Sequence, residues 1–541
     1  LFETSLTRAY VDQNVRAGWW PNTLLTDDLD AAARKDPGRT AIIDSRGTYT
    51  YGELRVACDH VSLGLLELGV RHGDVVTVQL PNWNEFVVMV LALERIGAVI
   101  NPIAPTFRER EVAGMMRLAR PVAAVVPHRF RDFDYPAMYA RMRAQTPSLK
   151  AVVVVDGERG EGDLSWAELI EAGRRDDRRR DVLTWLRPGP DDVSELIFTS
   201  GTTGEPKGVL HTPNTLASAA LGAIRSQELG ADDVFHMAST FAHQTGFIYG
   251  IRLPIHLGAT GIWQDVWDAS RFIELVEQHG ITFTMGATPF VMDTLRGLGP
   301  DGSPLRTLRT FISAGAPIAV PMAEEVRQRL TTRLAPGWGM TENGLGSVCM
   351  AGDPPEKTTT SDGRPHPGME LQVRRADGGA PGPGTEGDLF VRGPFTFVGY
   401  VQGRAFTERF FDREGWFETG DRALIDDQGF VRITGRTKDI IIRGGDNIPV
   451  KEIEDLILRH PAVAQVAVVA VPDERLGERA AAYVVLKPSQ TLDLTVLQQY
   501  MREHAVTTQF WPERLRIIDE MPTTPSGKVQ KYRLRELAKE S

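Results

Sequence analysis

Between two apolar runs lies a segment whose composition suits the binding of a polyphosphate. It reads Thr-Ser-Gly-Thr-Thr-Gly-Glu-Pro-Lys-Gly over residues 199–208. Glycine lets the backbone turn its N–H groups towards an anion, the hydroxyl groups add donors, and Lys207 adds a compact positive charge. The lysine follows proline and does not stand in the Gly-Lys-Ser/Thr context of a P-loop. From the residues alone, a hydroxyl-rich surface loop without a ligand remains an alternative.

A Gly-x-Gly-x-x-Gly match at Gly382–Gly387 is a poor candidate for a dinucleotide site. Such a site needs its turn to lie between a strand and a helix, whereas Pro381 and Pro383 interrupt this one and strand-like residues follow. The eleven histidines form no His-Glu-x-x-His motif. The only cysteines, Cys58 and Cys349, cannot build a four-cysteine zinc site or a disulfide framework, so we expect small buried thiols in a reducing compartment.

Alternating strand-like and helical runs indicate how the loop is positioned. Val75–Leu80 reads as a strand, and Asn84–Ile96 reads as a helix with a wide apolar face. Arg271–His279 and Ile281–Met285 repeat the pattern as a helix followed by a strand. This alternation predicts a large α/β fold with parallel strands.

Two changes in composition predict further units. The chain becomes rich in Gly and Pro around Ala376–Gly384 and then gives strand-like runs, which predicts an additional β-rich subdomain. A second change near Gly435–Asp439 precedes roughly a hundred residues that read as a compact α+β unit. We therefore expect a large multi-subdomain N-terminal body over residues 1–437 and a small, mobile C-terminal domain over residues 438–541.

Composition and charge narrow the classes of partner. The 541 residues include 61 Lys and Arg against 71 Asp and Glu, a net charge of −10, and 42% are hydrophobic. This is globular composition, and the acidic balance argues against a nucleic-acid partner and a polybasic membrane anchor. The first residues lack the apolar core of a signal peptide, and the uncharged stretch Val234–Ile251 contains histidines and glycines. We expect a soluble, cytoplasmic protein without integral membrane association.

The loop and six further motifs, in the same order along nearly the whole chain, resemble the adenylate-forming superfamily of acyl-CoA synthetases, amino-acid adenylation domains and luciferases. The six are Ser-Ala-Gly-Ala-Pro (313–317), Gly-Trp-Gly-Met-Thr-Glu (337–342), Thr-Gly-Asp (419–421), Gly-Arg-Thr-Lys-Asp (435–439), Gly-Gly-Asp-Asn (444–447) and Pro-Ser-Gly-Lys (525–528). The resemblance implies a carboxylic acid, ATP, Mg²⁺ and coenzyme A as the molecules that the site handles.

The implied chemistry explains the residue types. A carboxylate is a poor electrophile, because it is anionic and would have to expel oxide. Transfer to ATP gives an acyl-adenylate, from which AMP leaves readily. Because the carboxylate and the α-phosphate are both anions, metal and lysine charges must offset their repulsion.

The resemblance assigns roles around ATP. Glu342 would help to hold Mg²⁺, Thr341 would contact the α-phosphate, and Asp421 would accept hydrogen bonds from the ribose hydroxyls. Arg436 would support the ribose or a phosphate, and the segment 315–317 would lie against the adenine. The ATP-binding set implied in this way is Thr199, Ser200, Gly201, Thr202, Thr203, Gly204, Lys207, Gly315, Ala316, Pro317, Gly337, Trp338, Gly339, Met340, Asp421 and Arg436.

The C-terminal motifs imply a domain that rotates between two half-reactions. Lys528 would be the lysine that promotes adenylation, and Lys438 occupies the hinge position. Gly444 and Gly445 would let the pantetheine arm of coenzyme A pass close to the backbone, and Arg443 would help to hold coenzyme A. The catalytic set is therefore expected to comprise Lys528, Thr341, Glu342 and Lys438.

The acyl pocket is expected around Phe241–Phe247 and Gly286–Phe290. His243 matches the aromatic residue that the family places near the carboxylate, and Gly246 and Ala287 complete the expected wall. From the residues alone, a packed core histidine remains an alternative. An amino-acid substrate would call for an aspartate in Phe241–Phe247, and none is present.

The local sequences most resemble the branch of short-chain fatty acid–CoA and cyclohexanecarboxylate–CoA ligases. We therefore expect an ATP-dependent acid–CoA ligase for a short- or medium-chain or alicyclic acid. An aryl acid–CoA ligase, an enzyme that loads a carrier protein and a luciferase-like oxygenase are the alternatives. A homodimer is left open.

Overall fold

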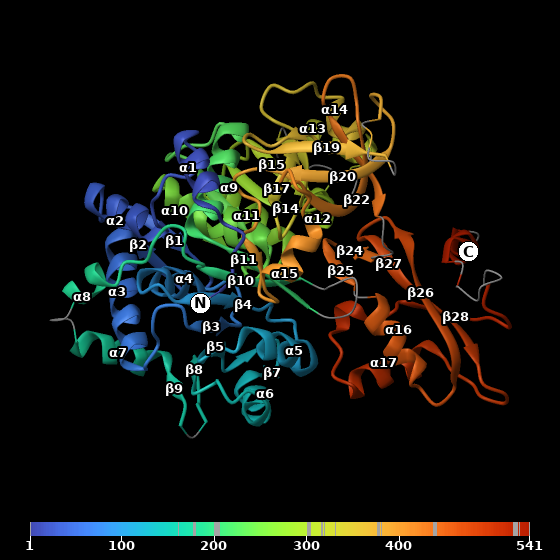
Figure 1. Ribbon diagram of the computed structural model, residues 1–541, viewed down its shortest axis with the longest axis horizontal. Helices are drawn as coiled ribbons and strands as arrows, with labels where there is room; N and C mark the ends of the chain where they lie inside the picture. Colours follow the sequence, from blue (N-terminus) through green and yellow to red (C-terminus); the bar gives the residue numbers. More distant parts are fainter. Residues whose placement is uncertain are drawn as a thin grey trace.

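The computed structural model describes most of the chain. The described residues are 2–160, 162–176, 180–199, 206–299, 305–314, 318, 320–330, 332–375, 379, 381–436, 441–448, 450–522, 529 and 531–539. Figure 1 shows their arrangement, with the elements from β24 onward gathered at one end of the molecule.

Two large sheets form the body. Within the described residues, one sheet has nine strands in the order β18 (Arg364–Pro365), β17 (Gly344–Val348), β16 (Arg333–Met340), β15 (Thr310–Ala314), β14 (Phe283–Ala287), β12 (Val234–Met237), β13 (Thr260–Trp263), β1 (Thr40–Ile43) and β2 (Thr48–Thr50). The other has eight described strands in the order β21 (Gly399–Tyr400), β11 (Lys207–His211), β10 (Glu195–Thr199), β4 (Val99–Pro102), β3 (Val75–Val78), β5 (Ala123–Pro127), β8 (Ala151–Val155) and β9 (Leu164–Ser165). The central strands of each sheet are parallel, as the alternating pattern predicted.

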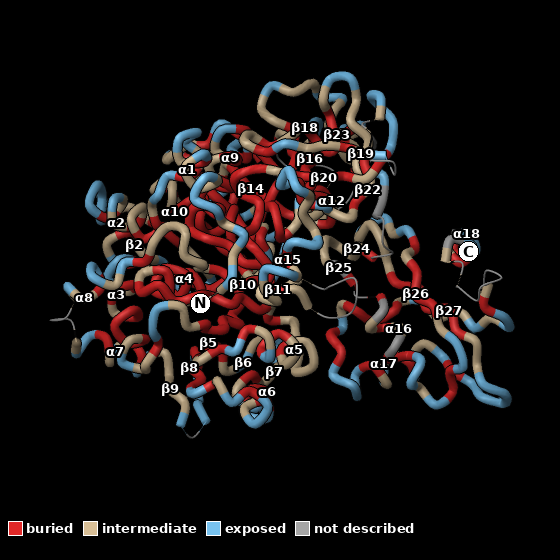
Figure 2. The backbone as a smooth tube through the Cα atoms, viewed as in Figure 1, coloured by how far each residue is buried: buried red, intermediate tan, exposed pale blue. Residues whose placement is uncertain are grey.

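Helices pack between and around these sheets. They are α1 (Arg8–Arg16), α2 (Leu25–Lys35), α3 (Tyr51–Glu67), α4 (Asn84–Arg95), α5 (Glu109–Ala119), α6 (Tyr135–Met142), α7 (Trp166–Arg175), α8 (Asp181–Trp185), α9 (Pro213–Gln227), the π-helix Thr245–Arg252, α10 (Leu253–Leu257), α11 (Ala269–His279), α12 (Thr288–Gly297), α13 (Val320–Arg329), α14 (Lys357–Thr360) and α15 (Arg404–Thr407). Helix α4 is buried almost all round, which its continuous apolar run explains, because a helix that is apolar on every face must lie inside the core. Figure 2 shows this buried interior between exposed outer helices.

A buried ion pair fixes α4 within the core. Glu94 accepts a hydrogen bond from Arg252 of the π-helix at 2.8 Å, and each residue is only 3% exposed. The second carboxylate oxygen of Glu94 accepts the backbone N–H of Leu25, at the start of α2. Because a buried charge is costly unless it is paired, this network ties three helices to one geometry.

A smaller antiparallel sheet confirms the expected β-rich subdomain. It contains β19 (Glu370–Arg374), β20 (Gly387–Arg392), β22 (Phe417–Ile425) and β23 (Val431–Arg436). Leu389, Ala423 and Val431 pack there against Trp338 of β16. The small sheet is thereby fixed against the end of a strand of the large one.

The C-terminal elements form an α+β unit with its own cores. A sheet of β24 (Ile441–Arg443), β25 (Asp446–Ile448), β26 (Val463–Asp473), β27 (Gly477–Leu486) and β28 (Arg514–Ile517) packs against α16 (Val450–Leu458), α17 (Leu494–Glu503) and α18 (Lys531–Lys539). The expected domain boundary at 437/438 lies outside the described residues. No helix in the described part of the chain is long and apolar enough to cross a membrane.

Candidate active site

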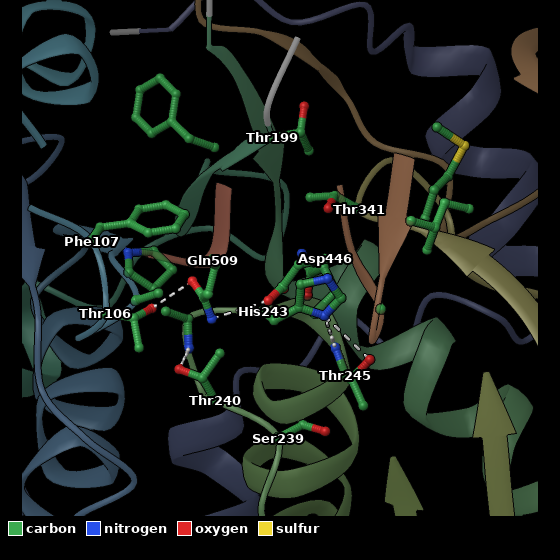
Figure 3. A pocket seen from close by; sticks show the side chains of 18 of the residues that line it. Thr106, Phe107, Thr199, Ser239, Thr240, His243, Thr245, Thr341, Asp446 and Gln509 are labelled. Atoms are coloured by element: carbon green, nitrogen blue, oxygen red, sulfur yellow. Dashed lines mark hydrogen bonds between the residues drawn. The ribbon is translucent and has the colours of Figure 1, made fainter. Parts of the chain in front are cut away.

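A cavity of about 1420 Å³ lies where the body meets the C-terminal elements. Its walls come from strand ends and loops of both large sheets, from β22 of the small sheet and from the segment around Gly444. Figure 3 shows part of this wall, with side chains from distant parts of the sequence converging. The cavity brings together most of the described residues that the motifs singled out.

The phosphate-type loop begins and ends at this cavity. Thr199 is the last residue of β10 and Lys207 the first residue of β11, and the two are directly paired in an antiparallel ladder. Both line the cavity. The loop residues Ser200, Gly201, Thr202, Thr203 and Gly204 lie outside the described residues. The two strands therefore hold both ends of the loop next to each other at the cavity.

An aromatic cluster holds the lysine of this loop. The Lys207 ammonium lies 3.9 Å from the ring centroid of Phe410 and 5.2 Å from that of Tyr400. A cation over an aromatic face is attracted by the ring quadrupole, which keeps the side chain near one place without neutralising its charge. Lys207 is thus a localised cation at the wall of the cavity.

Glu342 is a buried carboxylate beside the aromatic cluster that contacts Lys207. It is 4% exposed, lines the cavity, and accepts a hydrogen bond from the Tyr400 hydroxyl at 2.8 Å. Burial, and then the Glu342 charge, raise the pKa of Tyr400, so the phenol stays protonated and keeps donating. Among the described residues no group of three or more His, Cys, Asp or Glu side chains could hold a metal. A single carboxylate suits Mg²⁺ only if substrate phosphates and water supply the other ligands, which is how Mg²⁺ is often bound.

Thr341 is held by a neutral histidine. His211 is 1% exposed and its Nε2 lies 2.8 Å from the carbonyl oxygen of Thr341. Burial lowers the pKa of His211 to about 4, so the ring is neutral near pH 7. Because a carbonyl oxygen only accepts, the Nε2 carries the proton and donates it. This contact fixes the backbone between β16 and β17, where Thr341 and Glu342 lie.

Asp421 of β22 lines the cavity. Asp421 is 4% exposed, and its Oδ2 accepts the indole N–H of Trp338 at 2.9 Å. Its backbone faces that of Arg436 across the β22–β23 ladder. The structure describes the backbone of Arg436 but not its side chain. Asp421 therefore lies in the cavity wall, and its contact with a ribose stays a prediction.

Strands β14 and β15 end side by side at the cavity, in register with Gly337 of the longer parallel strand β16. Ala287 of β14, Ala314 of β15 and Gly337 of β16 are neighbours across the sheet, and all three line the cavity. Ligands of parallel sheets bind outside the carboxyl ends of the strands, so this edge is where a nucleotide is expected. Gly315, Ala316 and Pro317 follow β15 directly but lie outside the described residues.

Small residues in β16 are required by its neighbours. A side chain at Gly339 would put a Cβ 2.0 Å from the carbonyl oxygen of Gly344, and one at Gly337 would lie 3.0 Å from that of Ser347. Trp338 and Met340 alternate with these glycines and also line the cavity. The Gly-Trp-Gly-Met sequence therefore allows the strand to approach β17 closely while two large side chains shape the wall.

The expected acyl wall is a loop between β12 and the π-helix. His243 lines the cavity. Its side chain is accessible from the cavity, while protein surrounds its other sides. Its Nδ1 lies 3.3 Å from the hydroxyl of Thr245. Gly246 is buried and is not among the lining residues; a Cβ there would lie 2.2 Å from the carbonyl oxygen of Thr240, so this glycine permits the tight start of the π-helix.

Asp446 reaches the same wall from the C-terminal elements. Burial raises the pKa of Asp446 and lowers that of His243, while attraction between the two opposes both shifts. Asp446 also accepts a hydrogen bond from Gln509 at 3.2 Å, and Gln509 in turn accepts one from Thr106 of the body at 3.1 Å. Figure 3 shows His243, Asp446, Gln509 and Thr106 side by side. The prediction from sequence missed Gln509, since no motif marks it.

The paired glycines also lie at this wall. Gly444 and Gly445 line the cavity with φ of +59° and +96°, a backbone conformation that disfavours other residues. A Cβ at Gly445 would lie 3.5 Å from the Cβ of Ala287. Arg443 donates to the carbonyl oxygen of Gln509 and pairs with Glu513, and it is not among the lining residues. Lys438 and Lys528 lie outside the described residues.

Beneath the acyl wall lies a buried acid–amide pair that the sequence analysis did not identify. Gln244 donates to Glu195 at 2.7 Å, and both are almost fully buried. Burial raises the pKa of Glu195 to about 8, although the Gln244 hydrogen bond and the Arg252 charge act in the opposite direction. The Oε1 atoms of both side chains have no hydrogen-bond partner in the described structure. A proton on Glu195 offers the donor that this pair needs. The signal in the sequence was a glutamate in an otherwise apolar strand.

Comparisons with known proteins identify the family. The model described as "AMP-binding enzyme" matches residues 29–401, and that described as "AMP-binding enzyme C-terminal domain" matches residues 452–528. The chain therefore belongs to the AMP-binding enzyme family.

Relatives match it over nearly their whole length. The medium-chain fatty-acid–CoA ligase of Escherichia coli is 35% identical, covering 96% of this chain and 91% of that protein. The salicyl-AMP ligase / salicyl-S-ArCP synthetase of Mycobacterium tuberculosis is 33% identical, covering 95% and 91%. Among solved structures, apo MbtA of Mycobacterium smegmatis has a TM-score of 0.71 at 32% identity, covering 99% of this chain and 98% of that chain. The o-succinylbenzoate CoA synthetase of Bacillus subtilis, at 23% identity and a TM-score of 0.80, covers 96% and 99% and shares the fold.

We predict that Trp338→Phe weakens AMP binding roughly tenfold, because it removes the donor that orients the Asp421 carboxylate, and hydrogen bonds to charged groups contribute about 1.5–3 kcal/mol. Titration calorimetry with AMP measures this. Trp185→Phe, at a side chain that is 86% exposed, is the matched control and should bind as the parent protein does. Equal affinity of Trp338→Phe and the parent protein would contradict the assignment of Asp421.

We also predict that Glu195→Gln makes the stability of the folded protein less sensitive to a rise in pH. The ordinary pKa of 4.5 applies to the unfolded chain, and the folded value is about 8. Between these values only the unfolded chain ionises, so the folded state loses stability as pH rises through this window. Melting temperatures measured from about pH 5 to about pH 8 should fall less in Glu195→Gln than in the parent. Glu277→Gln, at an exposed position, is the control. If the melting temperatures of all three proteins changed with pH in the same way, the raised pKa of Glu195 would be refuted.

Proposed function

We propose that this protein is an ATP-dependent, AMP-forming acid–CoA ligase. The observation that carries the proposal is a single cavity with two kinds of wall. Lys207, Glu342 and Asp421 of the body suit a nucleotide, and Gly444 and Gly445 of the C-terminal elements line the same space. A site that only bound a nucleotide would not need the second wall.

In the first half-reaction a carboxylate oxygen of the acid attacks the α-phosphorus of ATP, and pyrophosphate leaves. Lys207 and the donors of the loop 199–208 bind the phosphates, Thr341 contacts the α-phosphate, and Asp421 binds the ribose. Glu342, together with substrate phosphates, would hold Mg²⁺, whose positive charge would offset the repulsion between the two anions. Lys528 adds a further cation near the leaving oxygen.

In the second half-reaction the sulfur of coenzyme A attacks the carbonyl carbon of the acyl-adenylate, and AMP leaves. Gly444 and Gly445 offer a wall without side chains, which lets a pantetheine arm pass close to the backbone. A Cβ at Gly445 would lie 3.5 Å from the Ala287 methyl group, so a larger side chain there would be crowded against β14.

The two proposed half-reactions require two domains that move relative to each other. We place the boundary at 437/438 with Lys438 as the hinge. The separate hydrophobic core built from residues between Ile441 and Trp511 supports an independently packed C-terminal domain.

The acid is proposed to be uncharged apart from its carboxylate, and of short or medium chain length or alicyclic. Met285, Phe290, Trp267 and Leu345 give the cavity an apolar surface beside His243. The ligase of Escherichia coli named above supports an aliphatic acid. The salicyl-AMP ligase / salicyl-S-ArCP synthetase supports two alternatives, an aryl acid as the substrate and a carrier protein as the acyl acceptor.

A panel of acids in an AMP-release assay tests the function. We expect aliphatic or alicyclic acids to give AMP release that coenzyme A stimulates strongly, together with an acyl-CoA product. Salicylate and an aryl carrier protein serve as comparison substrates. If coenzyme A adds no product with any acid that supports pyrophosphate exchange, the ligase proposal fails, and product on the carrier protein would favour the loading function.

Lys528→Ala tests the assignment of the two half-reactions. We predict that it slows acid-dependent pyrophosphate exchange by orders of magnitude, because a cation is lost where negative charge develops. Thioester formation from supplied acyl-AMP should change much less. Arg533→Ala, a cation in the same C-terminal segment, is the control. Equal losses in both half-reactions would contradict the role of Lys528.

A further inference from the structure

The hairpin that joins β26 and β27 reaches from the C-terminal elements to helix α12 of the body. At its tip, Arg475 pairs with Asp293 through two hydrogen bonds, from Nε to Oδ1 at 3.2 Å and from Nη2 to Oδ2 at 2.8 Å. A guanidinium that grips a carboxylate with two donors fixes orientation as well as distance. No motif of the sequence marks either residue.

The tip is built to present Arg475 in one position. Asp473 accepts the backbone N–H groups of Arg475 at 3.0 Å and Leu476 at 2.8 Å. Gly477 follows with φ of +78°, the left-handed conformation that closes such a turn. The side chain of Arg475 therefore projects from a turn with little freedom of its own.

The same turn holds the paired glycines. The carbonyl oxygen of Leu476 accepts the N–H of Gly444 at 2.7 Å, and Arg443 pairs with Gly477 across β24 and β27. Arg475 and Gly444 are thus two points on one small rigid unit. Fixing the first against the body also fixes the second.

Helix α12 receives this unit at two places. Ala287 precedes the helix and lies against Gly445, while Asp293 lies further along and binds Arg475. One contact lies just before the helix and the other within it, and together with the Gln509–Thr106 contact they hold the C-terminal elements against the body.

Asp293 also belongs to the acyl side of the cavity. It accepts the indole N–H of Trp267 at 3.1 Å, and Trp267 packs on Phe290 with ring centroids 4.5 Å apart. Both rings line the cavity. Burial would raise the pKa of Asp293, but the hydrogen bonds from Arg475 and Trp267 outweigh it and lower the pKa, so the carboxylate is ionised.

We propose that Arg475 and Asp293 are positioning residues for thioester formation. Their ion pair sets the C-terminal domain along α12 so that Gly444 and Gly445 stand beside Ala287 at the cavity. The inference rests on the proposed acid–CoA ligase function and deepens it, because it assigns to one half-reaction a contact between domains. Adenylation needs the other orientation of the domain, so it does not use this pair.

The test compares the half-reactions in Arg475→Ala, Asp293→Asn and the double variant. Thioester formation from supplied acyl-AMP should slow roughly threefold to tenfold in each single variant, a modest factor because Arg475 is 47% exposed. Asp293→Asn keeps an oxygen for Trp267, so it removes mainly the charge. The double variant should be no slower than either single one, because both remove the same interaction. Arg475→Lys should recover part of the rate.

Acid-dependent pyrophosphate exchange should stay within about twofold of the parent in every variant, which also shows that each one folds. Arg296→Ala is the matched control: Arg296 lies 3.7 Å from the same carboxylate but belongs to α12 itself. It should leave both half-reactions unchanged. Unaltered thioester rates, additive losses or equal losses in both half-reactions would overturn the inference. If the parent transfers no acyl group to coenzyme A, this inference falls with the proposed function; if it does, and the variants match it, only the inference falls.

Discussion

The parallel register of β14, β15 and β16 is the constraint on which the site depends. It brings Ala287, Ala314 and Gly337 to one edge of the sheet, and this edge forms part of the cavity wall. The continuation of β16 carries Trp338 to Asp421 and leads into Thr341 and Glu342, while Ala287 leads into α12. Because these parallel strands lie in register, residues far apart in sequence meet at one edge of the sheet.

Charge is organised locally against the sign of the whole chain. The net charge is −10, yet ATP, coenzyme A and a carboxylic acid are all anions. The structure meets this locally by placing Lys207 over aromatic rings at the cavity. The overall balance is therefore a poor guide to what the site binds.

The sequence predicted the fold and most of the cavity because both rest on local signals. Apolar periodicity located α4 and the parallel strands, and the motifs located Lys207, Glu342 and Asp421 at the cavity. It could not predict the Glu195–Gln244 pair or the Arg475–Asp293 pair, since each joins residues that only tertiary packing brings together. Gly246 was expected in the wall and is instead buried behind it, because a glycine pattern does not distinguish access for a ligand from close packing of the backbone. The roles assigned to all of these site residues, Lys438 and Lys528 included, stay predictions.

In the proposed mechanism one cavity serves two orientations of the C-terminal domain, and the structure holds the one with the paired glycines at the cavity. The distance between spin labels at Glu277→Cys on α11 and Gln490→Cys beyond β27 measures this directly, since Cys58 and Cys349 are only 0% and 4% exposed and should not react. With coenzyme A and a stable acyl-adenylate analogue, we expect a distance that agrees with the structure. With a non-reactive ATP analogue and the acid, we expect a second, clearly different distance. One unchanged distance under both conditions would contradict it.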